Sequence, residues 1–283
     1  MKRSLLARIL WQIESAGEKK LRVSDIAKEN GISVFHLTRV FTIKTGSSPA
    51  RFLRMRRLTQ AAYRLTGTDK SIVEIALRAG YGSQEAFTRA FSAAFAVTPA
   101  AVGKGAAIPK HLIQESITLP NTETYTPLMP PRFELIKARR IVGLSARYSF
   151  ETNGAIPAQW VEFITRAEAE GLTLAGQSFG VCHGMTEDGT FSYLAGVEAD
   201  THTIPKGFSC VTIQEGRYAV FTHFGSAATL RDTVEVIWNR YLPQARFQNT
   251  GAPDFELYPA EYNPTDPKGK VEIWIPIVDV ENP

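Results

Sequence analysis

Two arginines fifty positions apart, Arg39 and Arg89, have the same neighbours: a serine six residues before each and a phenylalanine two residues after it. A guanidinium can donate two parallel hydrogen bonds to a guanine edge, an amide side chain can bind adenine, and threonine or phenylalanine can contact the thymine methyl group. Side chains of these kinds, on helix faces not needed for packing, could read base edges in DNA. The candidates in the two segments are Phe35, Thr38 and Arg39, and Gln84, Glu85, Thr88 and Arg89.

Each arginine lies in the second of two predicted helices that are joined by a tight turn. A small alanine allows the two helices to pack closely, a glycine permits the sharp turn after the first helix, and a serine caps the second helix. Ala27, Gly31 and Ser33 occupy these positions in the first copy, and Ala76, Gly80 and Ser83 occupy them in the second. A helical bundle with arginines on a solvated face is the alternative, but the repetition in phase favours two helix-turn-helix units and DNA binding.

The charge distribution supports this interpretation. Residues 1–104 contain 18 Lys and Arg against 7 Asp and Glu, whereas the remaining residues contain 14 against 21. A basic half is typical of a phosphate-binding surface. Between the two copies, Pro49 opens an arginine-rich predicted helix over residues 50–65, which would keep the two units at a fixed separation. One chain could then insert both recognition helices into successive major grooves, about 34 Å apart, of an asymmetric double-stranded site.

The first domain resembles the DNA-binding domain of the AraC/XylS family of transcription regulators over residues 5–102. The resemblance is carried by residues 71–91, which read Ser-Ile-Val-Glu-Ile-Ala-Leu-Arg-Ala-Gly-Tyr-Gly-Ser-Gln-Glu-Ala-Phe-Thr-Arg-Ala-Phe, and by a Thr-Pro pair that follows them. It implies that base contacts come from the candidates named above. Phe35 and Thr38 stand where tryptophan and glutamine are common in the family, so the first half of the target sequence is expected to differ.

The second half of the chain predicts a different fold. Residues 105–131 have the proline and polar content of a linker. Beyond them, predicted strands alternate with two predicted helices, over residues 157–171 and 227–242, in two similar runs. We therefore expect an all-α domain with two helix-turn-helix units at residues 1–104 and an α+β domain at residues 132–283. The α+β domain should consist of two pseudo-repeated β-rich units, each with one helix, and a ligand groove between them.

Residues 132–279 of this domain resemble the GyrI-like effector-binding domains. The resemblance is carried by four segments, at residues 156–160, 218–225, 255–258 and 271–277. It implies that Glu256 meets the cationic group of a lipophilic ligand, with Trp160 and Tyr193 as candidate ring residues. A desolvated organic cation would pair with the carboxylate and gain about 0.5–2 kcal/mol from each ring.

The residues alone leave alternatives to this effector site. Without the resemblance, Glu256 is interpreted as an exposed strand carboxylate, because it alternates with apolar neighbours, and Trp160 serves equally well as a helix-to-sheet packing residue. Two further strand glutamates could share the cleft: Glu198 and Glu272.

Together, the two resemblances imply a bacterial, Rob-like member of the AraC/XylS family. Such a regulator is expected to activate stress or multidrug-response genes, with double-stranded DNA, RNA polymerase and a small-molecule effector as partners. Two other functions stay open for the GyrI-like domain. It could hydrolyse small molecules if Glu256 shared a cleft with a second carboxylate such as Glu272, or it could be a ligand-free interaction module. We expect a regulator rather than an enzyme.

The sequence indicates no cofactor and no metal site. Cys182 and Cys210 have no metal-ligand spacing and form no disulfide framework, so we expect them to be packing residues in a reducing compartment. No run approaches about 18 apolar residues, and the first residues lack a signal-peptide pattern. We therefore expect neither a membrane span nor a membrane partner, and a cytoplasmic location.

Overall fold

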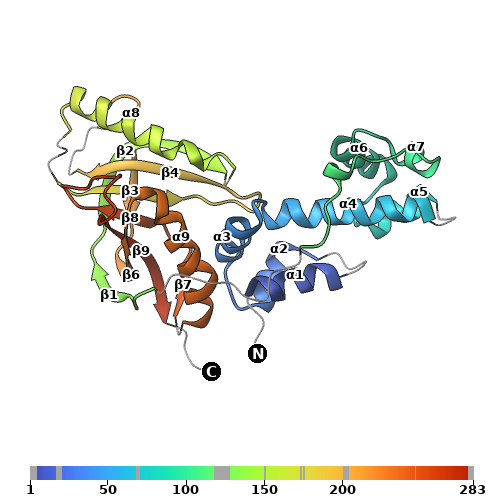
Figure 1. Ribbon diagram of the computed structural model, residues 1–283, viewed down its shortest axis with the longest axis horizontal. Helices are drawn as coiled ribbons and strands as arrows, with labels where there is room; N and C mark the ends of the chain where they lie inside the picture. The colour runs from blue at the N-terminus through green and yellow to red at the C-terminus, as the bar shows by residue number, and fades with distance from the viewer. Residues whose placement is uncertain are drawn as a thin grey trace. The chain divides into compact units, whose positions relative to one another are not determined.

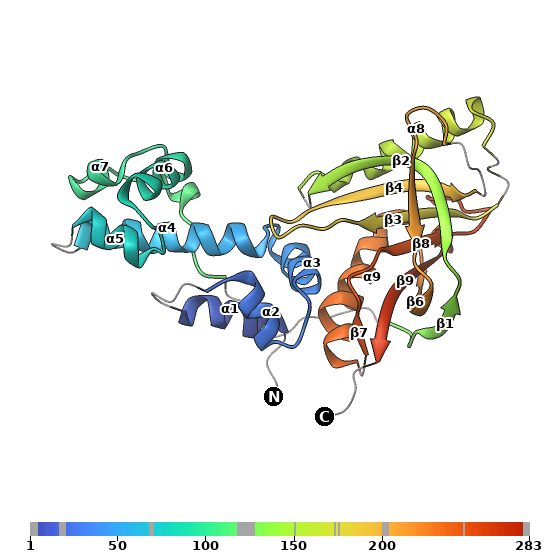
Figure 2. The same ribbon diagram turned by 180° about the vertical axis from the view of Figure 1, so that it is seen from behind.

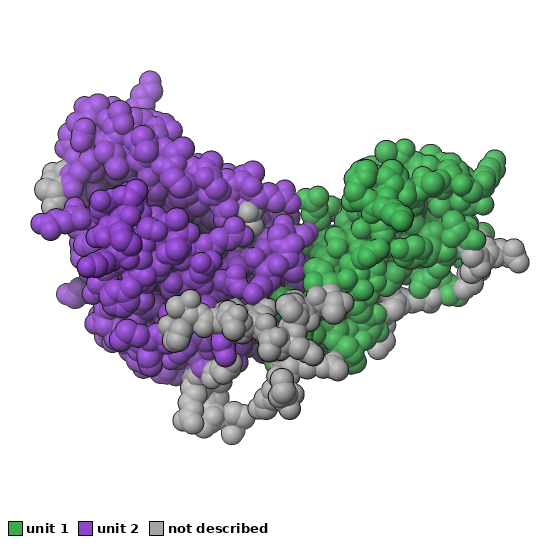
Figure 3. Space-filling model, viewed as in Figure 1, with its two compact units in different colours: residues 1–30, 48–122 green, residues 31–47, 123–283 purple. Residues whose placement is uncertain are grey.

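The computed structural model describes residues 5–16, 21–67, 71–117, 128–149, 151–172, 174, 176–199, 204–245 and 247–279. The chain divides into two compact units, drawn in green and purple in Figure 3. Unit 1 comprises residues 1–30 and 48–122, and unit 2 comprises residues 31–47 and 123–283. Among the described residues, no helix has both the length and the apolar character needed to cross a membrane.

Unit 1 is built of helices (Figure 1). They are α1 (Leu5–Ser15), α2 (Val23–Glu29), α4 (Pro49–Gly67), α5 (Ile72–Arg78), α6 (Gln84–Phe95), α7 (Pro99–Gly103) and the 3-10 turn η1 (Lys110–Leu112). Ser71 and Glu74 form a capping box at the start of α5, and the Ser83 hydroxyl accepts a hydrogen bond from the third backbone N–H of the next helix, α6. Gly80, with φ +85°, makes the turn between them. The predicted second helix-turn-helix unit is therefore confirmed.

The apolar sides of α4, α5, α6 and α7 meet in one core. Its buried members include Leu58, Ala61, Ile75, Ala76, Phe87, Phe91, Phe95 and Val102. Ile108, Leu112 and Ile113 pack against this core, and the backbone N–H of Gln114 donates to the Thr59 hydroxyl at 3.1 Å. The first part of the predicted linker is thus packed onto unit 1, whereas residues 118–127 of that linker lie outside the described residues.

Unit 2 contains helix α3 (Val34–Thr45), which begins at a serine cap and ends at Gly46 with φ +71°. Its other helices are α8 (Ile156–Ala169) and α9 (Leu230–Val236), and α9 continues into a π-helical turn (Ile237–Tyr241). The strands are β1 (Arg132–Ile136), β2 (Arg139–Ser149), β3 (Ser178–His183), β4 (Thr190–Glu198), β5 (Ser209–Ile213), β6 (Gly216–Phe224), β7 (Phe247–Asn249), β8 (Asp254–Tyr258) and β9 (Lys270–Asp279).

The strands form one antiparallel sheet in the order β1-β6-β9-β8-β3-β4-β2-β5, with β7 paired to β9 (Figures 1 and 2). The run β2-α8-β3-β4 and the run β6-α9-β8-β9 place their strands in the same relative order, and the two runs meet where β3 pairs with β8. This confirms the predicted pair of β-rich units with one helix each. The predicted helix over residues 157–171 begins one residue after α8 and ends two residues beyond it. Residues 227–242 are helical as predicted, but only their middle part, α9, is an α-helix, since a 3-10 turn precedes it and the π-helical turn and a second 3-10 turn follow it.

Helices α8 and α9 cover the same face of the sheet. Residues directly opposite each other in antiparallel strands share a face, and the register places Tyr193, Glu256 and His223 together on one face. Phe163 of α8 packs into the cluster that contains Tyr193, and Thr233 of α9 is bonded to His223 at 2.7 Å. The opposite face has its own apolar core: Ile141, Phe179, Val181, Leu194, Ile213, Tyr218, Val220, Phe255, Leu257 and Trp274.

Candidate effector site and DNA-reading helices

Glu256 lies in the middle of β8, directly opposite Gly180 of β3, on the face that α8 and α9 cover. Its Oε2 accepts hydrogen bonds from the hydroxyls of Tyr193 and Tyr258, each at 2.8 Å. Among the described residues, no group donates a hydrogen bond to its other oxygen, Oε1. A Cβ at position 180 would collide with the Tyr193 hydroxyl and lie 2.7 Å from Oε2, so glycine is what allows the tyrosine to reach the carboxylate.

Aromatic rings surround this carboxylate. The Trp160 indole on α8 donates from Nε1 to the Tyr193 hydroxyl at 3.0 Å, and its ring lies edge-on to Tyr258 with centroids 5.2 Å apart. The ring of Tyr262 lies 4.9 Å from that of Tyr258. The structure therefore brings together the three residues predicted for the effector site: Glu256, Trp160 and Tyr193. Tyr258 was not among the predicted residues, although it is two residues along the strand from Glu256 and must share its face.

The electrostatics of this cluster favour an incoming positive charge. Burial raises the pKa of Glu256, and the hydrogen bonds from Tyr258 and Tyr193 oppose that rise. Burial, together with the neighbouring carboxylate, raises the pKa of both tyrosines well above their usual range, so both keep the protons that they donate. A carboxylate that has lost much of its hydration without gaining a full countercharge is stabilised by a cation.

The other glutamates considered from the sequence lie elsewhere. Glu272 is opposite Leu257 in the sheet and therefore on the face away from Glu256. It pairs with Arg132 at 2.8 Å and accepts from the Trp274 indole at 3.2 Å. Glu198, at the end of β4, is exposed and lies 3.7 Å from Arg139. The geometry that hydrolysis by Glu256 and Glu272 would require is therefore not found.

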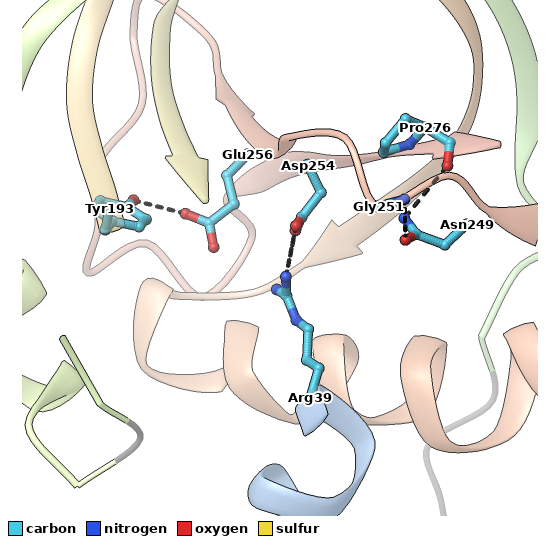
Figure 4. A network of polar contacts seen from close by, with 7 residues as sticks. All are labelled: Arg39, Tyr193, Asn249, Gly251, Asp254, Glu256 and Pro276. Carbon is cyan, nitrogen blue, oxygen red and sulfur yellow. Dashed lines mark hydrogen bonds and ion pairs between the residues drawn. The ribbon is translucent and has the colours of Figure 1, made fainter. Parts of the chain in front are cut away.

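A second carboxylate, the buried Asp254, lies two residues before Glu256 on the same strand face (Figure 4). Nη1 of Arg39, on α3, donates to both of its oxygens at 2.7 Å. The Arg39 guanidinium carbon also lies 4.5 Å from the ring centroid of Trp238, in the π-helical turn after α9. Burial raises the pKa of Asp254, and the charge and hydrogen bonds of Arg39 oppose that rise.

The turn before β8 fixes where Asp254 lies. The Asn249 side chain donates from Nδ2 to the Pro276 carbonyl at 3.3 Å and accepts from the Gly251 backbone N–H at 2.8 Å (Figure 4). Gly251 adopts φ +82°, which most side chains would disfavour. These contacts tie the chain to β9 immediately before β8 begins.

The predicted outward face of α3 is not outward in this structure. Thr38 is fully buried, Arg39 is only 6% exposed, and Phe35 is half-buried with its ring 5.6 Å from Trp238. The sequence pattern separated the apolar stripe of α3 from its polar side correctly, but it could not show that the polar side faces a carboxylate 215 residues away. The expected exposure of these side chains is therefore corrected, and their role in DNA reading stays a prediction.

Two further contacts join α3 to the α9 segment. His36 Nε2 lies 3.1 Å from the Trp238 carbonyl oxygen, and the Lys44 ammonium lies 2.5 Å from the Glu235 carboxylate. Burial lowers the pKa of His36 to about 4, so the imidazole is neutral in this position at neutral pH. Helix α3 is thus docked along its length rather than through one ion pair.

The candidate DNA-reading side chains of α6 lie away from the core, on the outward face that the sequence predicted. Gln84, Glu85 and Arg89 are exposed and Thr88 is half-buried, while the phenylalanines of the same helix are buried in the core of unit 1. Cys182 is buried and Cys210 is half-buried on the sheet, consistent with packing residues. Within the described part of the chain, no three His, Cys, Asp or Glu side chains are grouped so that they could bind a metal ion.

Two family profiles match the chain. One, described as a GyrI-like small molecule binding domain, matches residues 129–278, and the other, described as a helix-turn-helix domain, matches residues 26–105. The first match contains the sheet of unit 2 except the last residue of β9, and the second contains both predicted helix-turn-helix units from the middle of α2 onward.

Individual relatives match all or part of the chain. The transcriptional regulator Rob of Salmonella typhimurium is 24% identical over 282 residues, which cover 95% of this chain and 96% of Rob. The transposon Tn10 TetD protein of Escherichia coli is 42% identical over 91 residues, which cover 32% of this chain and 65% of TetD. Among solved structures, SAV2435 bound to tetraphenylphosphonium is 24% identical, with a TM-score of 0.45 over 53% of this chain and 94% of its own.

Proposed function

The chain belongs to the transcription regulators that join an AraC-type helix-turn-helix region to a GyrI-like small-molecule binding domain, and we propose that it responds to lipophilic organic cations by activating stress or multidrug-response genes. The observation that carries the effector assignment is the carboxylate of Glu256 enclosed by Tyr193, Tyr258 and Trp160. Activation of this kind makes RNA polymerase the expected protein partner.

The chemistry of the Glu256 cluster selects the ligand class. A neutral ligand would leave the desolvated carboxylate without a countercharge, whereas a lipophilic cation brings that charge at a low desolvation cost of its own. The surrounding rings add cation–π attraction of about 0.5–2 kcal/mol each. Tyr193 is almost fully buried while Glu256 is half-buried, so a ligand reaches the carboxylate from its accessible side and displaces tyrosine contacts as it enters.

DNA binding would use the two recognition helices, α3 and α6. Arg89 and Gln84 of α6 are exposed and follow a capped helix start, where side chains can enter the major groove. Helix α3 supplies the second set of contacts when its polar side is free. Two recognition helices in one chain, with different side chains, would bind an asymmetric site that spans two successive major grooves.

The effector assignment is tested by titrating the full-length protein with tetraphenylphosphonium and with the uncharged triphenylphosphine oxide, following tryptophan fluorescence. Trp160 is part of the site, so its emission should report occupancy. We expect saturable quenching with a preference of at least tenfold for the cation. Glu256→Gln removes the charge while keeping the shape of the side chain, so it should abolish the preference.

Glu272→Gln is the matched control, because Glu272 lies on the opposite face of the same sheet. This variant should keep the wild-type preference. An unchanged preference in Glu256→Gln would contradict the role of Glu256. Saturable binding of the cation without any effect on promoter binding or transcription would instead separate the effector site from regulation.

A further inference from the structure

We propose that Asp254 and Trp238 form a second cation site beside Glu256, and that the Arg39 side chain occupies this site as its resident ligand. Binding of an effector cation at Glu256 then releases Arg39 to read DNA. This inference rests on the proposed function, because it takes Glu256 as the point where the effector cation binds. It assigns Arg39 two exclusive positions, one against the carboxylate and one against a base edge.

Arg39 is bound as a small cationic ligand would be. One nitrogen donates to both oxygens of Asp254, and the guanidinium lies over the ring of Trp238. Both charged side chains are almost completely buried. Asp254 with the Trp238 ring thus offers a cation the same two groups, a carboxylate and an aromatic ring, as Glu256 with its aromatic neighbours.

Arg39 also lacks part of the hydrogen bonding that a buried side chain normally has. Its Nε has no hydrogen-bond partner among the described residues, and the buried hydroxyl of Thr38 on the same helix also has none. Unsatisfied buried donors destabilise the docked position relative to one in which they bind water or DNA. These unsatisfied donors lower the stability of the docked state of α3, which the contacts of His36 and Lys44 with the α9 segment also maintain.

Glu256 is placed so that a cation bound to it perturbs this docked state. It is two residues from Asp254 on the same face of β8, a separation of about 7 Å along a strand. The Glu256 carboxylate contributes to the attraction that Arg39 experiences, so one guanidinium partly balances two carboxylates. A cation bound at Glu256 cancels that contribution and repels Arg39 across a short, poorly hydrated distance.

The same nitrogen cannot donate to Asp254 and to guanine at the same time. Release of Arg39 and the rest of the α3 polar side is therefore required before α3 reads a base edge. Because the effector and DNA both favour the released state, each must raise the affinity for the other by the same factor.

The test measures DNA binding by fluorescence anisotropy, using a labelled duplex selected from random sequence by the full-length protein. Tetraphenylphosphonium should tighten wild-type binding at least tenfold. Asp254→Asn should bind the duplex at least tenfold more tightly than wild type without the cation, and adding the cation should change that affinity less than twofold. Glu272→Gln, which breaks a more exposed ion pair on the same sheet, should match wild type in both measurements.

Arg39→Gln supplies the reciprocal measurement and does not depend on DNA binding. Removing the resident cation should raise the affinity for tetraphenylphosphonium at least tenfold, as followed by tryptophan fluorescence. Cooperative thermal unfolding of each variant establishes that it is folded. If Asp254→Asn is unfolded, the Arg39→Gln measurement decides the proposal, and an unchanged affinity for the cation overturns it.

The outcomes separate this inference from the proposed function. If wild type binds tetraphenylphosphonium through Glu256 but Asp254→Asn and Arg39→Gln behave as wild type does, the resident-cation proposal is wrong and the effector site stands. If wild type does not bind the cation at all, the effector assignment fails and the coupling falls with it.

Discussion

Acidification should weaken the docking of α3 through a single side chain, His36. Burial lowers its pKa from 6.5 to about 4, the hydrogen bond to the Trp238 carbonyl opposes this shift, and the charge of Arg39 adds to it. The folded protein therefore binds the proton more weakly than the unfolded chain. The stabilisation from neutral His36 is fully present above pH 6.5 and is lost as the pH falls from 6.5 towards 4. Between pH 7.5 and 5.5 these two pKa values give a loss of about 1.3 kcal/mol.

Urea unfolding followed by circular dichroism at pH 7.5 and 5.5 measures this loss. Other groups also titrate in this range, so the prediction concerns the difference between wild type and His36→Gln, which cannot take up a proton. The pH-dependent loss in His36→Gln should be smaller by about 1.3 kcal/mol. His111→Gln, a change at an exposed histidine of unit 1, should leave the wild-type dependence intact. Equal pH dependence in wild type and His36→Gln would refute the argument that burial keeps His36 neutral.

Two other substitutions test the site and the exposed recognition helix. Gly180→Ala places a methyl group against the Tyr193 hydroxyl and Glu256, so it should destabilise the protein by about 1–3 kcal/mol in thermal unfolding and weaken cation binding. Gly154→Ala, where nothing lies within 4 Å of the new carbon, is the control, and full cation affinity in Gly180→Ala would show that the tyrosine contact is dispensable. Arg89→Ala should weaken binding to the selected duplex by about 1–3 kcal/mol while changing binding to random DNA much less. An equal loss on both duplexes in that comparison would assign Arg89 to the phosphate backbone.

The second helix-turn-helix unit could be predicted from sequence because its determinants are local. Ser83 caps the helix that it precedes, Gly80 adopts the positive φ that its own turn requires, and Phe87 and Phe91 are one helical turn apart. The pseudo-repeat of the sheet was predictable for a related reason. Strand and helix periodicities recur in the same order in the two halves, and in each half the last two strands, β3–β4 and β8–β9, pair as direct neighbours in the chain.

The residues that form the effector cluster were harder to predict from the sequence. Tyr193 reaches Glu256 across 63 residues, and only the register of β3 with β4 and β8 brings the two together. The alternation along β8 placed Glu256 and Tyr258 on one face, but it could not decide whether that face was solvated. Helices α8 and α9, which cover that face, decide it, and Trp160 of α8 contacts Tyr258 of the second repeat.

The first recognition helix shows why residue type alone cannot distinguish a DNA-reading surface from a docking surface. The acceptors of a guanine edge and the two oxygens of a carboxylate make similar demands on a guanidinium, so an arginine suited to one is suited to the other. Arg39 also uses the planarity of its guanidinium to lie over Trp238, which lysine would match less well. The basic side of α3 and the buried carboxylates of β8 thus have complementary charge for the same reason that α3 and DNA do. A regulator can therefore use one side chain in both its docked and its DNA-bound state. In the proposed switch, the guanidinium that would bind the promoter is the group that the acidic site on β8 attracts when no effector is present.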